Sequence, residues 1–251
     1  MMTTPLPAGL HRLGDGLANF YVLAEGQDLT LVDAGLPAHY GQLTALLARI
    51  GRSVPDIRAV LLTHAHLDHL GLAEQVRREA GAEVWVHELD AAALADPRRP
   101  GTASRPERRL SRYLLRCPSA VAVPLHLARA GAFRTLPVTE ASYLRDGMVL
   151  DLPGRPEVIE VPGHTPGSVA FHLPAQGVIL TGDALVTRDG LTGATGPVIV
   201  NAAFTHDTAQ ALTSLSSLAA LDASLVLPGH GAPYEAGIKE AVRYAQLAGT
   251  R

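Results

Sequence analysis

The chain of 251 residues lacks several features that would place it in a specialised class of protein. It has a single cysteine, Cys117, so no disulfide can form within the chain, and we expect a reducing compartment, the cytoplasm. Its apolar runs, such as residues 59–62 and 178–180, are far shorter than the roughly 20 residues that cross a bilayer. The first residues have neither a basic start nor an apolar stretch of signal-peptide length, so we expect neither export nor a membrane anchor.

The composition is that of an ordinary globular protein. Apolar residues make up 47% and charged residues 18% of the chain, which argues against a disordered or fibrous protein. The hydrophobic pattern predicts an α/β fold in which strands and helices alternate in two similar halves. The predicted strands cover residues 19–24, 29–32, 59–62, 83–86, 149–152, 158–161, 168–173, 177–180 and 225–227, and the predicted helices cover residues 40–50, 70–80, 208–221 and 238–247.

An arginine-rich segment, residues 90–136, separates the two halves, and we interpret it as a helical insertion within a single domain of residues 1–251. Between Arg98 and Arg134 it has nine arginines and one acidic residue, Glu107. Residues 106–115 and 120–130 are its predicted helices. The insertion is interpreted as a lid or as a contact in a homodimer, with a solvated basic helix as the simpler alternative. A nucleic-acid-binding role depends on this arginine cluster alone, and we do not favour it.

The eleven histidines equal the combined number of Phe, Trp and Tyr, and several of them are clustered. The densest cluster is Thr63-His64-Ala65-His66-Leu67-Asp68-His69, which directly follows a predicted strand. His64 and His66 share a face of an extended segment, while Asp68 and His69 lie where the chain turns into a helix. Four ligand-type side chains within six residues exceed what one ion takes from so short a loop. We therefore predict two neighbouring metal ions.

Three further candidate ligands follow a common local pattern of an apolar strand, a glycine and then the ligand. They are His164 after Gly163, Asp183 after Gly182, and His230 after Gly229. Because an open site on an α/β layer is built from loops at one edge, we expect these side chains to meet the His64 to His69 cluster. Glycine allows the backbone to bend sharply next to an ion.

Together these residues resemble the five ordered motifs of the metallo-β-lactamase superfamily, including its glyoxalase II-like and lactonase-like members: Asp33, the cluster from His64 to His69, His164, Asp183 and His230. The resemblance implies a four-layered αββα sandwich with the metals at one edge. It implies that His64, His66 and His164 hold one ion, that Asp68, His69 and His230 hold the other, and that Asp183 bridges both. It also implies that Asp33 holds a ligand histidine in the required tautomer. Thr63, Thr165 and Ser168 are interpreted as caps of ordinary turns, with hydrogen bonds to groups that support the metal ligands as the alternative.

The ligand chemistry and the resemblance predict a metal-dependent hydrolase. Imidazole and carboxylate ligands without thiolate favour two zinc ions, with iron and manganese as alternatives. A hydroxide that bridges the ions would attack the carbonyl of a thioester, lactone or ester, and Asp68 and Asp183 are assigned to catalysis as well as to metal binding. The alternative function is that of an oxygenase resembling the persulfide dioxygenases, which bind one iron.

Departures from individual branches of the superfamily narrow this prediction. True β-lactamases of this fold lack the bridging aspartate, so Asp183 disfavours that activity. Flavodiiron oxidoreductases have a glutamate at the position of His66. Homoserine-lactone lactonases have a tyrosine at the position of Val186. The resemblance therefore defines a family and leaves the substrate open.

The expected substrate is a small molecule that binds between the insertion and the metals. Apolar residues of the insertion would contact an acyl group, and Arg108, Arg109 and Arg112 would attract an anionic carrier such as coenzyme A or phosphopantetheine. Further candidate substrate contacts are Tyr113, Tyr143, His126, Asn201 and His206.

Overall fold

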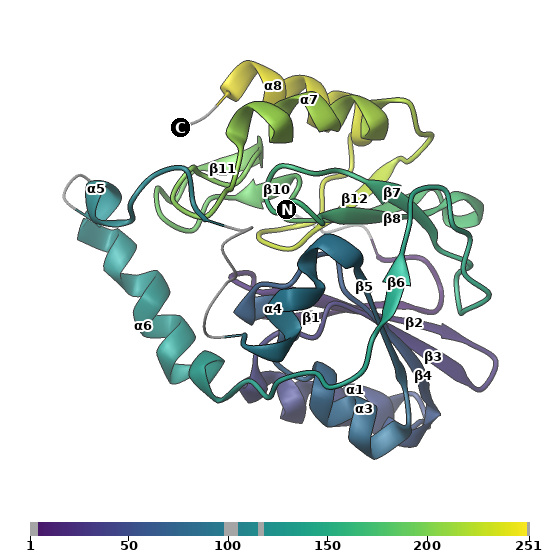
Figure 1. The fold of residues 1–251 in the computed structure, drawn as a ribbon. Helices are drawn as coiled ribbons and strands as arrows, with labels where there is room; N and C mark the ends of the chain where they lie inside the picture. Colours follow the sequence, from purple (N-terminus) through teal and green to yellow (C-terminus); the bar gives the residue numbers. More distant parts are fainter. Residues whose placement is uncertain (1–4, 98–104, 115–117, 250–251) are drawn as a thin grey trace.

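The structure, a computed structural model, describes residues 5–97, 105–114 and 118–249. Its centre is formed by two main sheets that lie face to face (Figure 1). The first has the order β1(Leu10–Gly14), β2(Asn19–Glu25), β3(Asp28–Val32), β4(Ile57–Leu61), β5(Glu83–His87), β6(Ser142–Leu144). The second has the order β12(Leu225–Pro228), β9(Val178–Gly182), β8(Val169–Leu173), β7(Glu157–Glu160), and β10(Val186–Arg188) pairs separately with β11(Thr195–Val198).

Helices cover the outer face of each main sheet. The helices α1(Tyr40–Arg49) and α3(Ala73–Ala80) lie against the first sheet, and α7(Thr208–Ala219) and α8(Ile238–Ala248) lie against the second (Figure 1). Strand β2 illustrates why two cores form, because successive side chains of a strand point to opposite faces. Phe20 and Val22 belong to the core under α1 and α3, whereas Tyr21 and Leu23 belong to the core between the sheets. The predicted four-layered αββα sandwich is confirmed.

Two predicted elements outside the insertion differ in the structure. The helix expected over residues 70–80 is divided into α2(Leu67–Leu70) and α3, because Gly71 donates its backbone N–H to the Gly35 carbonyl at 2.8 Å instead of continuing one helix. The strand expected over residues 149–152 is wrong. This segment forms a single bridge, from Val149 to Glu157, and then turns back at Arg155, whose φ is +46°.

The helices of the insertion are α4(Ala91–Ala95), α5(Ser111–Leu114) and α6(Ala122–Arg129). The helix expected over residues 106–115 is thus much shorter, and Leu115 lies outside the described residues. All of α6 is described, and none of its side chains is buried. Apolar contacts hold its two ends: Ala120 packs with Leu191 and Ala203, while Ala130 and Ala132 pack with Leu36. Since these partners belong to different halves of the fold, α6 spans from one half to the other (Figure 1).

Among the helices of the described residues, none combines the length and the apolar character needed to cross a membrane. Three of the nine arginines counted in the sequence, Arg98, Arg99 and Arg116, lie outside the described residues, as does Cys117. The side chain of Arg112 is likewise outside the described part.

Candidate metal centre

The seven predicted metal ligands lie at one edge of the sandwich. His64 and His66 follow β4, and Asp68 and His69 belong to the short helix α2. His164 follows β7, Asp183 follows β9, and His230 follows β12. Their ligand atoms form overlapping groups whose members lie within 4.8 Å of one another. Residues that are more than a hundred positions apart in the chain therefore face one small space.

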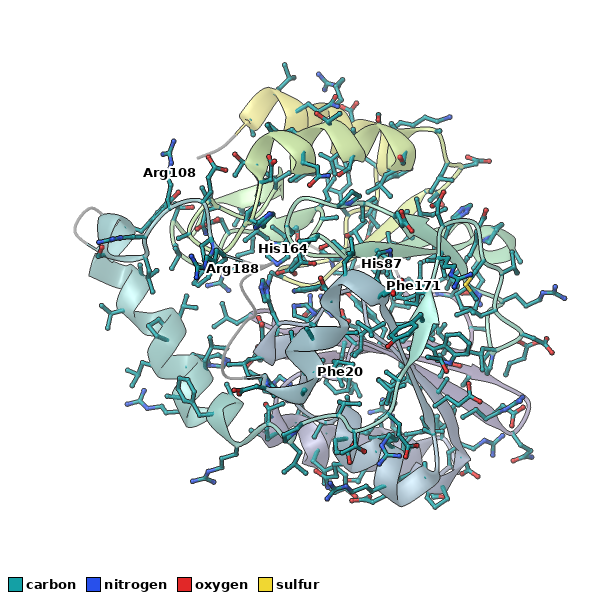
Figure 2. The ribbon with its side chains drawn as sticks, viewed as in Figure 1. Phe20, His87, Arg108, His164, Phe171 and Arg188 are labelled. Carbon is teal, nitrogen blue, oxygen red and sulfur yellow. The ribbon has the colours of Figure 1, made fainter. Side chains whose placement is uncertain are left out.

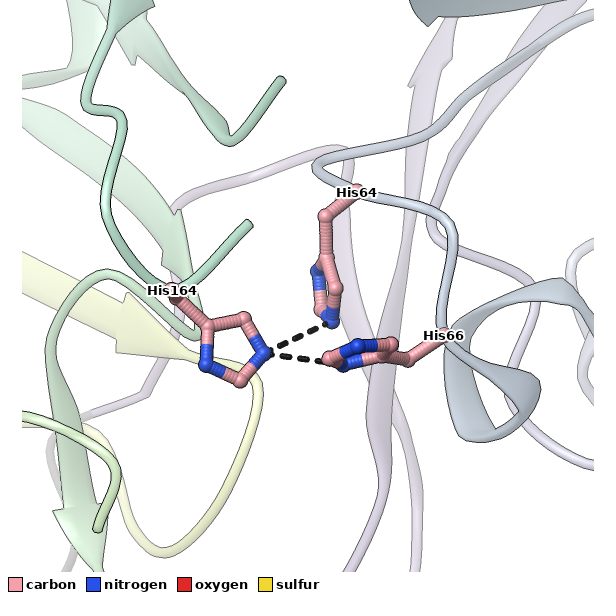
Figure 3. Close-up of side chains that lie close together, drawn as sticks. All are labelled: His64, His66 and His164. Atoms are coloured by element: carbon pink, nitrogen blue, oxygen red, sulfur yellow. Dashed lines mark hydrogen bonds between the residues drawn. The ribbon is translucent and has the colours of Figure 1, made fainter. Parts of the chain in front are cut away.

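The first group consists of His64, His66 and His164, whose imidazoles converge (Figure 3). Nε2 of His164 lies 3.2 Å from Nε2 of His64 and 2.9 Å from Nδ1 of His66. Burial holds the pKa of His64 and the pKa of His164 well below the usual value, and neighbouring imidazoles lower both further. Burial also lowers the pKa of His66. These histidines are therefore neutral near pH 7, which is the form that binds metal.

The second group consists of Asp68, His69 and His230. Oδ2 of Asp68 lies 3.5 Å from Nε2 of His230 and 3.8 Å from Nε2 of His69. Burial alone would lower the pKa of His230, but Asp183 and Asp68 raise it to about 9. Burial would also lower the pKa of His69, but Asp33 and Asp183 raise this pKa well above the usual value. The two groups thus differ in charge before any ion binds.

Asp183 lies between the two groups. Its Oδ2 is 2.9 Å from Nε2 of His230 and 3.4 Å from Nε2 of His164, while its Oδ1 is 3.4 Å from Nε2 of His69. Burial raises the pKa of the Asp183 carboxyl, but His230 and His69 reverse this effect and hold the pKa well below the usual value. Asp183 is therefore ionised, and its carboxylate lies within reach of histidines from both groups.

The donor set fits two divalent ions. Nε2 of His69 and Oδ1 of Asp183 are buried and form no hydrogen bond within the described residues. A buried polar atom without a partner is costly, and both atoms face the same space as the other ligands. Imidazole nitrogens and carboxylate oxygens of this kind are ligands for zinc, iron or manganese. The residues present therefore fit a site for divalent metal ions at this edge.

Asp33 fixes the orientation of His69 by contacting the ring nitrogen that faces away from the other ligands. Its Oδ2 accepts a hydrogen bond from Nδ1 of His69 at 2.8 Å, and its Oδ1 accepts one from the backbone N–H of Thr63, also at 2.8 Å. With the proton on Nδ1, Nε2 of His69 is left free to face a metal. This is the role that the resemblance implies for Asp33.

Asp90 has a comparable role that the sequence reasoning missed. Its carboxylate accepts hydrogen bonds from the backbone N–H of Ala65 at 3.0 Å, the hydroxyl of Thr165 at 2.7 Å and the backbone N–H of Gly167 at 2.9 Å. It thereby joins the loop of His64 and His66 to the loop of His164. In the sequence, Asp90 precedes an alanine-rich segment and is typical of a helix cap, so its long-range role has no local signal. Thr165 and Ser168 form the predicted turn, in which the N–H of Thr165 donates to Oγ of Ser168 at 2.9 Å.

The glycine that precedes each of the three distant ligands is required by close packing. A Cβ at Gly163 would lie 2.2 Å from the backbone nitrogen of Ala211, and a Cβ at Gly182 would lie 2.4 Å from Oγ1 of Thr63. A Cβ at Gly229 would lie 2.3 Å from Oδ1 of Asp183. The absence of a Cβ at these glycines therefore lets neighbouring segments of the chain pack closely against them, in addition to allowing the bend that the sequence pattern indicated.

A cavity of about 560 Å³ opens over the metal ligands. Its apolar wall includes Leu17, Leu67, Leu110, Val123, Leu127 and Phe204. Its cationic lining consists of Arg108, Arg109 and Arg188. Of the predicted substrate contacts, His126 and Asn201 line the cavity, whereas Tyr113, Tyr143 and His206 do not.

Arg188 was missed because it lies outside the arginine-rich insertion, at the end of β10. In Figure 2 it lies near His164, while Arg108 extends outward from the insertion. The strand is fixed beside a metal ligand, because Thr187 donates its backbone N–H to the His230 carbonyl at 3.0 Å. Within the described residues the Arg188 guanidinium has no ion pair, so its charge is available to the cavity.

The fold and the metal ligands define a member of the metallo-β-lactamase superfamily. The model of the metallo-beta-lactamase superfamily matches residues 13–230, and the chain belongs to this family. An uncharacterized protein of Mycobacterium tuberculosis is 34% identical over 244 residues, covering 92% of this chain and 91% of its own. The hydroxyacylglutathione hydrolase GloC of Haemophilus influenzae is 28% identical over 160 residues, covering 63% of this chain and 62% of its own.

Solved structures give the same family. The metallo-beta-lactamase family protein TTHA1429 of Thermus thermophilus has a TM-score of 0.71 and 29% identity, covering 96% of this chain and 79% of its own. The structure of TTHA1623 in a di-iron-bound form has a TM-score of 0.64 and 26% identity, covering 92% of this chain and 96% of its own. Membership in this family supports the coarse function of a metal-dependent hydrolase.

Proposed function

We propose that this protein is a dinuclear metal-dependent hydrolase that cleaves the carbonyl bond of a thioester, lactone or ester. The observation that carries the proposal is the position of Asp183 between two complete ligand groups, with one oxygen facing His230 and His164 and the other facing His69. A single carboxylate placed in this way suits two adjacent ions.

When bound, two divalent ions lower the pKa of a water molecule and stabilise the negative charge that develops on a carbonyl oxygen. The chain orients this chemistry through its own residues. His69 is held in one tautomer by Asp33, and the loops of His64 and His164 are held together by Asp90. Asp68 is the anionic residue of the second group, and Asp183 is the anionic residue between the two groups. We assign zinc by ligand chemistry, with iron as the alternative because TTHA1623 was solved with two irons.

The two-ion proposal is favoured over the mononuclear oxygenase. A one-iron site needs only two histidines and an aspartate, whereas Asp68, His69 and His230 form a second group beside the first. The orphaned Nε2 of His69 belongs to this second group. An occupied first site alone would leave that atom without a partner.

The cavity favours a substrate with an apolar acyl group and an anionic carrier. The apolar wall that includes Val123, Leu127 and Phe204 suits an acyl group, while Arg188 and Arg109 suit a carboxylate or phosphate. A coenzyme A, phosphopantetheine or glutathione thioester combines these two properties. The relative GloC is named a hydroxyacylglutathione hydrolase, and this name supports a thioester as the first choice.

The experiment is a hydrolysis panel with zinc-loaded and iron-loaded protein. It includes acyl thioesters, lactones, simple esters, β-lactams and phosphodiesters, with metal content measured in the same samples. We expect about two ions per chain and the fastest turnover on a thioester or lactone. One iron per chain with oxygen consumption, or turnover confined to phosphodiesters, would contradict the proposal.

A further inference from the structure

Asp15, in the loop between β1 and β2, directs its two carboxylate oxygens toward different parts of the molecule. Its Oδ1 accepts hydrogen bonds from the backbone N–H groups of Leu17 at 2.9 Å and Ala18 at 3.1 Å. Its Oδ2 lies 2.9 Å from Nε2 of His126 and 3.6 Å from Nε2 of His39. Asp15 contacts no metal ligand directly.

The Oδ1 side leads to the metal centre. The carbonyl of Leu17, the residue that Asp15 holds, accepts a hydrogen bond from Nδ1 of His230. This bond leaves Nε2 of His230 facing Asp183 and the proposed ions, 2.9 Å from the Asp183 carboxylate. The same loop is joined to the His230 loop a second time, since Asn19 donates its backbone N–H to the Gly229 carbonyl at 2.8 Å. The position of Leu17 therefore sets the orientation of His230.

The Oδ2 side leads to α6, the helix that covers the cavity. His126 lies in the middle of α6, and the 2.9 Å approach of its Nε2 to Oδ2 of Asp15 is the one polar side-chain contact of this fully described helix. Its neighbours Val123 and Leu127 line the cavity. His39 is fixed on the other side of Asp15, because its Nδ1 accepts from the Leu36 N–H at 3.1 Å and its Nε2 thus carries the proton. Asp15 therefore receives polar contacts from the body and from the roof of the cavity.

We propose that Asp15 is a positioning residue shared by the metal centre and the cavity roof. Through Oδ1 and Leu17 it orients His230, and through Oδ2 and His126 it holds the middle of α6 over the metals. The inference depends on the proposed metal site, and its test measures the metal-free protein and metal binding instead of hydrolysis, so it can fail independently of the proposed activity.

The test compares three substitutions that separate the two oxygens. Asp15→Asn keeps an acceptor for Leu17 but loses the charge facing His126, Asp15→Ala loses both functions, and His126→Gln loses only the roof contact. Asp56→Asn is the matched control, since Asp56 also accepts from a backbone N–H, that of Ser53 at 2.7 Å, but at an exposed turn. The measurements are the Nδ1–H signal of His230 in the metal-free protein by NMR, zinc affinity by chelator competition, and amide hydrogen exchange of residues 122–129.

We expect Asp15→Ala to shift the His230 signal and to weaken the second zinc by about 10- to 100-fold. All three variants should speed exchange in α6 by about two- to fivefold, because a single partly exposed contact between a histidine and a carboxylate contributes modestly. Asp15→Asn and His126→Gln should leave the His230 signal in place, and Asp56→Asn should change neither readout. If Asp15→Ala lowers only Tm, or if Asp15→Asn leaves α6 exchange unchanged, the shared role is wrong.

Discussion

The metal ligands and the cavity roof line the same cavity but are held in place in different ways. His64, His69 and His164 are almost fully buried, and Asp33 or Asp90 fixes the loops that carry them. Helix α6 has no buried side chain and is held by apolar contacts at its ends and by His126 in its middle. The difference separates two tasks. The buried ligands are held in fixed positions, as metal binding requires. Helix α6 is held less firmly, so its position can adjust to the shape of the substrate.

The largest effect is expected from removing Asp183, the carboxylate at the centre of the metal ligands. Replacing Asp183 with Ala removes the carboxylate that faces both groups, and several kcal/mol of metal-derived stabilisation correspond to a loss of more than about 100-fold in kcat. Metal analysis should find clearly fewer than two ions per chain. The exposed Asp56→Ala serves as the control and should retain both ions. Two tightly held ions and full activity in Asp183→Ala would show that the bridging role is wrong.

A smaller effect follows from loosening the edge without removing a ligand. Asp33→Asn keeps the size of the side chain but removes the anion that accepts the proton of Nδ1 of His69 at 2.8 Å. We expect the affinity for the second ion to fall by about 10- to 100-fold, with the first ion retained. Stepwise zinc titration against a chelator measures both affinities. Equal weakening of the two sites would mean that Asp33 supports the fold instead of His69.

The two ligand groups should also differ in their response to pH. In the metal-free protein, His230 has a pKa of about 9 and His69 a pKa well above the usual value, so both are protonated at pH 7 and must lose their protons to bind an ion. Loss of the His230 proton should therefore make the affinity of the second site fall by about tenfold for each pH unit below 9, and the His69 proton should steepen this fall. His64 and His164, with lowered pKa values, make the first site nearly independent of pH between 7 and 9.

Proton release during zinc titration in weak buffer measures this difference. The second equivalent of zinc should release more protons at pH 7 than the first, and the share that comes from His230 should disappear above pH 9. Asp68→Ala, which removes one ligand of the second group, should abolish the second step and retain the first. Identical proton release for the two equivalents would contradict the assignment.

The smallest expected effect concerns the cavity wall. Arg188→Gln should raise KM for a coenzyme A thioester by about three- to fivefold with little change in kcat, because an exposed arginine acts through a screened attraction. Arg134→Gln is the matched control and should have less effect, since Arg134 is an exposed arginine of the insertion that does not line the cavity. A neutral ester of the same acyl group should respond to neither substitution. A fall in kcat on both substrates would instead show that Arg188 supports the structure around the metal ligands.

The sequence predicted the layers and the ligands because both depend on local patterns. Alternation in β2 and helical spacing in α1, α7 and α8 determine which faces are buried, and each distant ligand follows a strand and a glycine. The strand expected over residues 149–152 failed because a turn at Arg155, with positive φ, has no apolar signature. The roles of Asp90 and Arg188 were not predicted from the sequence, for a different reason. Their partners lie across the fold, and a single sequence carries no record of such contacts.

The close packing at Gly163, Gly182 and Gly229 has a consequence for how such a protein can change over generations. Each glycine lies directly before a ligand, and any added carbon would meet an atom at 2.2 to 2.4 Å. Substitution of any of these glycines is therefore expected to abolish metal binding. Mutation in α6 meets solvent on one side and a cavity on the other. Libraries designed to obtain new substrate preferences should accordingly concentrate diversity in residues 122–129 and leave the three glycines unchanged.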